Sequence, residues 1–180
     1  KSRGNIVNPG DHFDREGVDA VRWYMVTAGA PWAELRFDPQ GLRETYARFF
    51  LTLWNTYRFH ADYAALDDFD PSAEPPELVP LDSWALSRLA AVTEEYTALF
   101  EQWRFHRAAR LLEEFLVDDV SNWYVRRSRR RLWTDAPTQD KAACQHTLHM
   151  LLETVCRLMA PIAPYLSDHI HHALTGSSAH

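Results

Sequence analysis

The stretch of this sequence best suited to binding chemistry is SNWYVRRSRRRLW, at positions 121–133. Five of its residues are arginines within a span of six positions: Arg126, Arg127, Arg129, Arg130 and Arg131. A guanidinium group binds phosphate through two parallel N–H donors and also stacks on aromatic rings. Arginines beside aromatic residues therefore favour contact with RNA, whose phosphates and unstacked bases match both properties. The alternative is a solvated or salt-bridged helix end, because cations are favourable at a helix C-terminus.

Three further residues of this stretch are candidates for the same contact. Trp123 and Trp133 either stack on bases or pack in the core, and their type and helical spacing favour the core. Asn122 either reads the edge of a base or caps a neighbouring helix, and the sequence leaves both interpretations open. The charge pattern alone does not decide between RNA contact and a structural role.

The sequence contains no complete active site of a known pattern. It has no glycine-rich phosphate loop, no Gly-x-Ser-x-Gly and no His-Glu-x-x-His. Cys144 and Cys156 are twelve positions apart and form no Cys-x-x-Cys pair, so we expect buried thiols and a reducing compartment. We expect no metal site. The pattern predicts a binding module that is not itself a catalyst.

The charge of the chain is acidic overall but unevenly distributed. The 180 residues carry a formal net charge of −6, and 46% are hydrophobic, which predicts a folded chain with a substantial core. Residues 101–133 contain eight arginines and five acidic residues, so this region is basic and the rest of the chain carries all of the excess negative charge. An acidic body with one basic helix would direct a polyanion to a single surface. We expect this polyanion to be RNA and not DNA.

The sequence shows no signal for export or for membrane insertion. It has neither a signal peptide nor a run of eighteen apolar residues. We therefore expect a cytoplasmic, monomeric protein without a membrane partner. Because the first residue is Lys1 and not methionine, we expect the chain to be cut from a longer protein.

Apolar residues at spacings of three and four predict that helices position these candidates. Asp14, Asp38 and Asp82 are expected helix caps, and Pro39 follows the second of them in the first turn. Residues 67–80 contain four prolines and five acidic residues, which predicts an extended, exposed linker. The expected helices span positions 15–27, 39–66, 83–100, 104–133, 140–159 and 165–174. With no convincing strand, this pattern predicts an all-α antiparallel helical bundle.

Several strings along the chain occur together in one enzyme family. They are FFLTLWNTYRF at 49–59, LDSWALSRL at 81–89, SNWYVRRSRRRLW at 121–133 and APIAPYLSDHI at 160–170. On these strings the chain resembles isoleucyl-tRNA synthetases, which are class I aminoacyl-tRNA synthetases. GVDAVRWYM at 17–25 resembles the segment that follows the KMSKS signature of this class. KSRGN at 1–5 matches the last two residues of that signature and its usual continuation.

The resemblance implies a parent enzyme that uses ATP and Mg²⁺ to attach isoleucine to tRNA(Ile), in a catalytic domain upstream of this chain. It implies that Lys1 and Ser2 are an ATP-binding remnant of the signature loop, whose lysine faces the phosphates. The signature is incomplete here, so we expect no ATP bound to this fragment.

The resemblance also divides the chain and assigns its candidate site. Residues 1–36 would be a connecting segment that contacts the tRNA stem, and residues 37–180 the anticodon-binding bundle. The candidates for tRNA binding would be Asn122, Trp123, Arg126, Arg127, Arg129, Arg130, Arg131 and Trp133.

Two other interpretations stay open. The chain would alternatively be the equivalent domain of a valyl- or leucyl-tRNA synthetase. It would otherwise be a helical scaffold without RNA contact, its arginines paired with Asp118, Asp119 or the acidic linker.

Overall fold

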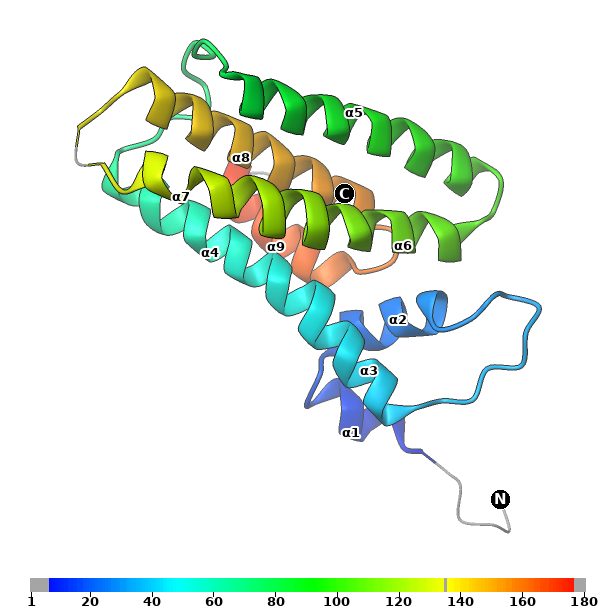
Figure 1. Cartoon of the computed structure of the whole chain (residues 1–180). Coiled ribbons are helices and arrows are strands. Elements are labelled where there is room, and N and C mark those ends of the chain that lie inside the picture. The colour runs from blue at the N-terminus through cyan, green and yellow to red at the C-terminus, as the bar shows by residue number, and fades with distance from the viewer. Residues whose placement is uncertain (1–6, 135, 177–180) are drawn as a thin grey trace.

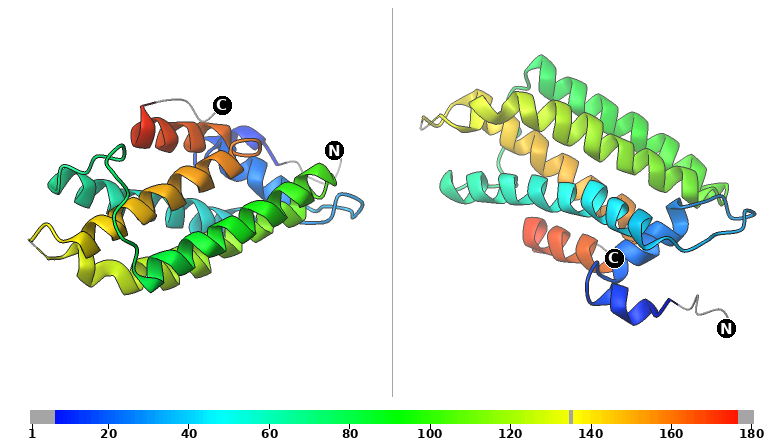
Figure 2. Two further views of the ribbon diagram at one scale, coloured as in Figure 1. Left: turned by 90° about the horizontal axis from the view of Figure 1, so that it is seen from above. Right: turned by 60° about the horizontal axis from the view of Figure 1, so that its bottom comes forward.

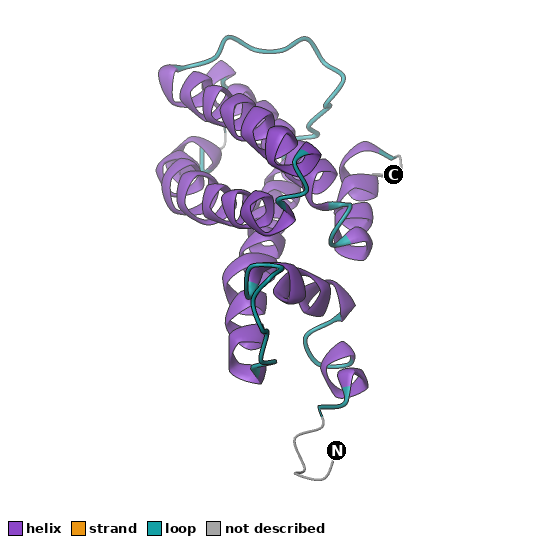
Figure 3. Ribbon diagram, turned by 90° about the vertical axis from the view of Figure 1, so that its right-hand side faces the viewer, coloured by secondary structure: helices purple, strands orange, loops and turns teal. Residues whose placement is uncertain are grey.

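The computed structural model describes residues 7–134 and 136–176, and within these ranges every regular element is a helix (Figure 3). The elements are α1 (Pro9–Phe13), α2 (Val18–Thr27), α3 (Pro39–Thr45), η1 (Tyr46–Phe50), α4 (Leu51–Leu66), α5 (Pro80–Glu101), α6 (Phe105–Glu114), η2 (Phe115–Val125), α7 (Arg126–Leu132), α8 (Gln139–Met159) and α9 (Pro164–Thr175). The prediction of an all-α bundle is confirmed.

Two of the long helices contain π-helical turns but run without interruption. The first consists of α3, η1 and α4, and the second of α6, η2 and α7. With α5 and α8 they form four long rods that lie side by side (Figure 1). The expected helices at 39–66 and 104–133 are therefore confirmed as continuous elements, to within one residue at each end.

Helix α8 is the central element of the bundle. It contacts α4, α5, α6, α7 and α9, and α9 lies beside it outside the four rods (Figure 2). A helix with neighbours on several sides must be apolar on more than one face. Both cysteines of the sequence, Cys144 and Cys156, lie on this helix, buried and unpaired, as predicted. No helix among the described residues is long and apolar enough to cross a membrane.

Helix α2 packs into the same core as the long rods. The Trp23 ring stacks on Phe49 of η1, with ring centroids 4.3 Å apart. The Arg22 side chain donates from Nε to the carbonyl oxygen of Ile162, 2.7 Å away, just before α9. Residues on both sides of position 36 thus contribute to one hydrophobic core.

The start of α2 differs from the prediction. We expected Asp14 to cap a helix over 15–27, but α2 begins at Val18 and Asp14 ends the short helix α1. The Asn8 side chain accepts from the N–H of Gly10, and Pro9 occupies the first turn, so the short helix α1 forms ahead of the helices that we expected. Gly17, with φ of +88°, separates the two helices because glycine adopts this conformation without strain.

Of the other two expected caps, one is confirmed. The Asp38 side chain accepts hydrogen bonds from the N–H groups of Gln40 and Gly41, and Pro39 opens α3. Asp82 is not the cap of α5, which begins earlier, at Pro80. The Asp82 carboxylate instead reaches back to the N–H of Val79 at 3.3 Å, from the third position of the helix.

Residues 67–79 contain no helix or strand and are largely exposed, as predicted for the linker. Its first residue is nevertheless tied to α8, because Asp67 accepts from Lys141 Nζ at 2.7 Å and from Gln145 Nε2 at 2.6 Å. Phe69 packs against two buried histidines, His60 and His149, at 5.6 Å between ring centroids in each case.

The histidine pair under the linker makes stability depend on pH. Burial, with a contribution from His149, lowers the pKa of His60 to about 3. Since an unfolded histidine has a pKa near 6.5, the unfolded chain binds the proton first as the pH falls. The contribution of His60 to stability is therefore complete above about pH 6.5, and it should decrease by up to about 1.4 kcal/mol per pH unit between about 6.5 and 3.

We expect this acid sensitivity to be smaller after the substitution His60→Leu. Urea unfolding at about pH 7.5, 6.0 and 5.0 measures it, with the exposed His172→Leu as the matched control. Stability curves of the original chain and His60→Leu that run parallel over this range would contradict the assignment.

Candidate nucleic-acid interface

Four of the five clustered arginines form one exposed surface. Arg126, Arg127, Arg129 and Arg130 are all exposed on α7, and we call them the arginine surface. None of the four makes an ion pair with a described residue, so their guanidinium groups remain free to bind an anion. Helix α7 lies at the end of the bundle opposite the α5–α6 turn (Figure 1).

Trp123 extends the arginine surface with an aromatic ring. It is 45% exposed, and the Arg127 guanidinium lies over its ring at 3.7 Å from the centroid. The ring of Trp84 on α5 is tilted against it at a centroid distance of 6.1 Å. The surface therefore combines cations with one flat apolar face, which suits both phosphates and unpaired bases.

The preference for placing Trp123 and Trp133 in the core was wrong. Trp133 is 59% exposed and Trp123 is 45% exposed, and neither belongs to the buried core. The core positions of this helix belong instead to Tyr124, Ser128 and Leu132, which recur every four residues and are buried. The tryptophans precede or follow these positions by one residue and consequently face solvent.

Arg131 differs from the other four arginines. It donates to both carboxylate oxygens of Asp82, from Nη1 at 2.7 Å and from Nη2 at 2.8 Å. Its Nη2 also lies 2.9 Å from the Asp140 carboxylate and donates to the Asp140 carbonyl oxygen at 2.9 Å. With 12% of its side chain exposed, Arg131 turns inward and is not part of the arginine surface.

The contacts in the structure also decide the expected structural roles of Asn122 and Asp119. Asn122 is exposed, and the side-chain caps of the described helices come from other residues, so the cap interpretation is wrong. Asp119, an expected partner of the arginine run, pairs with Arg88 on α5 at 2.8 Å. The ion pairing that the scaffold interpretation expected is therefore present only at Arg131 among the five arginines, and with carboxylates other than those expected.

Comparison with known protein families gives a result that is consistent with this geometry. A sequence model described as "Anticodon-binding domain of tRNA ligase" matches residues 82–180, which is more than half of the chain and includes the arginine surface. The chain belongs to this family of anticodon-binding domains.

The anticodon-binding domain is also similar to proteins named isoleucine–tRNA ligase over almost its whole length. It is 42% identical to the Bacteroides fragilis protein, over 98% of this chain and 16% of the relative. It is 40% identical to the Methanopyrus kandleri protein, over 95% of this chain and 16% of that relative. The chain thus spans about a sixth of the length of these curated relatives.

Solved structures support the fold of the domain. Methionyl-tRNA synthetase of Mycobacterium tuberculosis, in complex with methionyl-adenylate, matches 94% of this chain and 34% of its own with a TM-score of 0.78 and 19% identity. The leucyl enzyme (LeuRS) of Agrobacterium radiobacter K84, in a ternary complex with tRNA and LeuAMS, matches 98% of this chain and 20% of its own, with a TM-score of 0.69 and 21% identity. At these identities the likeness concerns the fold alone.

Two predicted site residues of the domain cannot be placed. Lys1 and Ser2, expected as the remnant of an ATP-binding loop, lie outside the described residues. Sequence reasoning also missed Trp84 and Tyr124 as neighbours of the site. In the sequence, Trp84 is one of several apolar residues of α5. It lies next to Trp123 only because α5 packs against η2.

Proposed function

We propose that the chain is the anticodon-binding domain of an isoleucine–tRNA ligase and that its arginine surface binds the anticodon stem-loop of tRNA(Ile). The observation that carries this proposal is the set of four exposed arginines that make no ion pair with a described residue, beside a partly exposed tryptophan. Such a surface offers bidentate donors to phosphates and a stacking face to bases that leave the helical stack. The names of the 42% identical relatives support isoleucine as the amino acid.

The proposal extends to the longer protein of which such a domain is part. That protein would be a cytoplasmic, monomeric enzyme that attaches isoleucine to tRNA(Ile) with ATP and Mg²⁺. Lys1 and Ser2 would contribute to its ATP site, and residues 1–36 would connect the catalytic domain to the bundle. Within this chain the domain binds and positions tRNA but performs no chemical step.

The proposal is tested by fluorescence anisotropy with labelled tRNA(Ile), tRNA(Val) and tRNA(Leu). We expect salt-sensitive binding of tRNA(Ile), with a linear decrease of log K against log salt. The titration should begin near 50 mM salt, because a single domain lacks the avidity of an enzyme that holds tRNA through several domains. Preference for tRNA(Val) or tRNA(Leu) would assign the domain to one of those enzymes instead. Absence of binding at all salt concentrations would favour a scaffold.

Trp123 is expected to contribute through stacking. Arg127 covers one face of the Trp123 ring, so an unpaired base would stack on the opposite face or take the place of the guanidinium, a contact worth about 1–3 kcal/mol by alanine substitution. We therefore predict that Trp123→Ala weakens tRNA binding by about 1–3 kcal/mol, with Trp123→Phe less affected. Trp103→Ala is the matched control, since this tryptophan is 78% exposed at the α5–α6 turn. Equal losses for Trp123→Ala and Trp103→Ala would exclude a specific stacking contact.

A further inference from the structure

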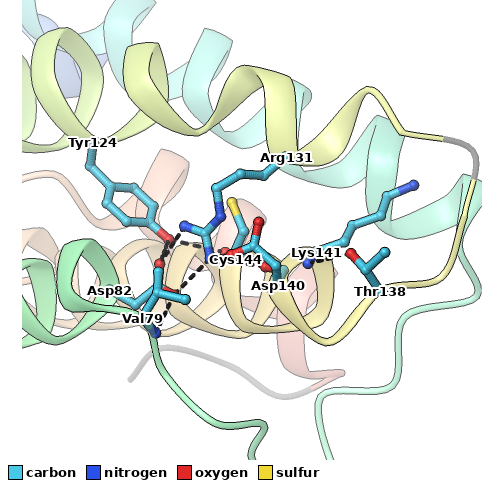
Figure 4. A network of polar contacts seen from close by, with 8 residues as sticks. All are labelled: Val79, Asp82, Tyr124, Arg131, Thr138, Asp140, Lys141 and Cys144. Atoms are coloured by element: carbon cyan, nitrogen blue, oxygen red, sulfur yellow. Dashed lines mark hydrogen bonds and ion pairs between the residues drawn. The ribbon is translucent and has the colours of Figure 1, made fainter.

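A completely buried carboxylate lies directly behind the arginine surface. Asp82, with 0% of its side chain exposed, accepts from both terminal nitrogens of Arg131. It also accepts from the Tyr124 hydroxyl at 2.7 Å and from the N–H of Val79 at 3.3 Å (Figure 4). Its two oxygens therefore serve four donors, which is what an ionised carboxylate needs when it is removed from water.

This carboxylate joins segments that are distant in the sequence. Asp82 belongs to the first turn of α5, Tyr124 to η2 and Arg131 to α7 (Figure 4). Arg131 continues the chain of contacts to Asp140 in the first turn of α8. The end of the linker and the starts of two helices are thus attached to the helix that carries the arginine surface.

The two residues that Asp82 holds define one face of that helix. Tyr124 and Arg131 are seven positions apart, about two helical turns, and therefore point to the same side. Ser128, between them, is also buried. When both ends of this face are attached to Asp82, the rotation of the segment about its own axis is set. The four arginines of the arginine surface, which occupy the other positions, must then face outward.

Arginine is required at position 131 for a geometric reason. Its planar fork reaches both oxygens of Asp82 and leaves Nη2 within hydrogen-bond distance of Asp140. A lysine is a single point charge with three donors on one atom and cannot span these partners in the same way. The remaining nitrogen, Nε, is buried without a hydrogen-bond partner among the described residues, while both terminal nitrogens are bound to protein oxygens.

We propose that Arg131 is a positioning residue, whose pairing with buried Asp82 holds η2 and α7 in the rotation that presents the arginine surface to tRNA. The proposal rests on the proposed function for its tRNA readout. Under this proposal four of the five arginines contact the tRNA, and Arg131 only fixes the orientation of the helix that carries them.

The test compares Arg131→Gln with Arg130→Gln, a neighbour from the exposed set. In a salt titration with labelled tRNA(Ile), Arg130→Gln should reduce the slope of log K against log salt by about 0.7–0.9, the value for one phosphate contact. Arg131→Gln should leave the slope unchanged but weaken binding at every salt concentration, by roughly 2- to 30-fold. Its urea unfolding midpoint should also fall, whereas that of Arg130→Gln should not.

Conservative variants keep the test decisive if Arg131→Gln does not fold. Tyr124→Phe removes only the hydroxyl group, which donates to Asp82 and lies 3.4 Å from the carbonyl oxygen of Cys144, from a ring that is buried and cannot touch RNA. It should weaken tRNA binding with an unchanged salt slope, in the same direction as Arg131→Gln. Arg131→Lys should resemble Arg131→Gln, while Arg130→Lys should resemble the original chain, because only position 131 uses the fork.

Three results would overturn the proposal. A reduced salt slope for Arg131→Gln would make Arg131 an RNA contact. Original affinity in folded Arg131→Gln and Tyr124→Phe variants would make the Asp82 pair important for stability alone. Absence of tRNA binding by the original chain would overturn the proposed function as well, and this outcome is recognisable because all variants would then behave alike.

Discussion

Replacing the arginine surface with glutamine, at Arg126, Arg127, Arg129 and Arg130 together, is expected to remove the salt-sensitive binding of tRNA. Each phosphate contact contributes about 0.7–0.9 to the slope of log K against log salt, so the slope should fall by about 2.8–3.6. Since all four side chains are exposed and make no ion pair with a described residue, the free energy of unfolding should change little. Anisotropy titrations and urea unfolding of the same preparations measure both quantities.

The control is a variant with the same change in net charge but elsewhere on the molecule. Arg36, Arg58, Arg104 and Arg107 are also exposed and can be replaced by glutamine together. This control should retain most of the salt slope, because long-range attraction contributes less than direct contact with a phosphate. Equal reductions for the two variants would indicate that net charge, and not the arginine surface, attracts the tRNA.

The second large effect is expected in the core, from Trp23→Ala. This side chain is 0% exposed, and it packs between α2 and the long rods through its stack on Phe49. Its Nε1 donates to Glu113 of α6 at 3.5 Å, and burial raises the pKa of that carboxyl above its ordinary value. Truncation of so large a buried ring should cost about 3–5 kcal/mol in the free energy of unfolding.

Met25→Ala, in the same helix, is the matched control. Met25 is 50% exposed, and its truncation should change stability by no more than about 0.5 kcal/mol. Because α2 shares the core of the bundle, unfolding should follow a single transition in both variants. A separate early transition, with a loss below about 1 kcal/mol for Trp23→Ala, would mean that α2 folds apart from the bundle.

The fold class and most helices could be predicted because their signals are local. Apolar residues at spacings of three and four mark one face of a helix, and a helix that buries this face is stable wherever its partner comes from. Asp38 followed by Pro39 is a complete start signal within two residues, and α3 begins there. The start of α5 was misplaced because Pro80 also satisfies the first turn, and the Asp82 carboxylate then acts from the third position.

The composition of the binding surface could not be predicted in full, since it depends on contacts between distant residues. The sequence alone determines an all-α bundle and an arginine-rich helix with neighbouring aromatic residues. Only the tertiary structure decides which arginine turns inward, because its partner Asp82 lies 49 positions away in the sequence. The same holds for Trp123, whose exposure follows from Tyr124 occupying the neighbouring core position. Helical rotation is set by the packed face, and that face is chosen by the neighbouring helices.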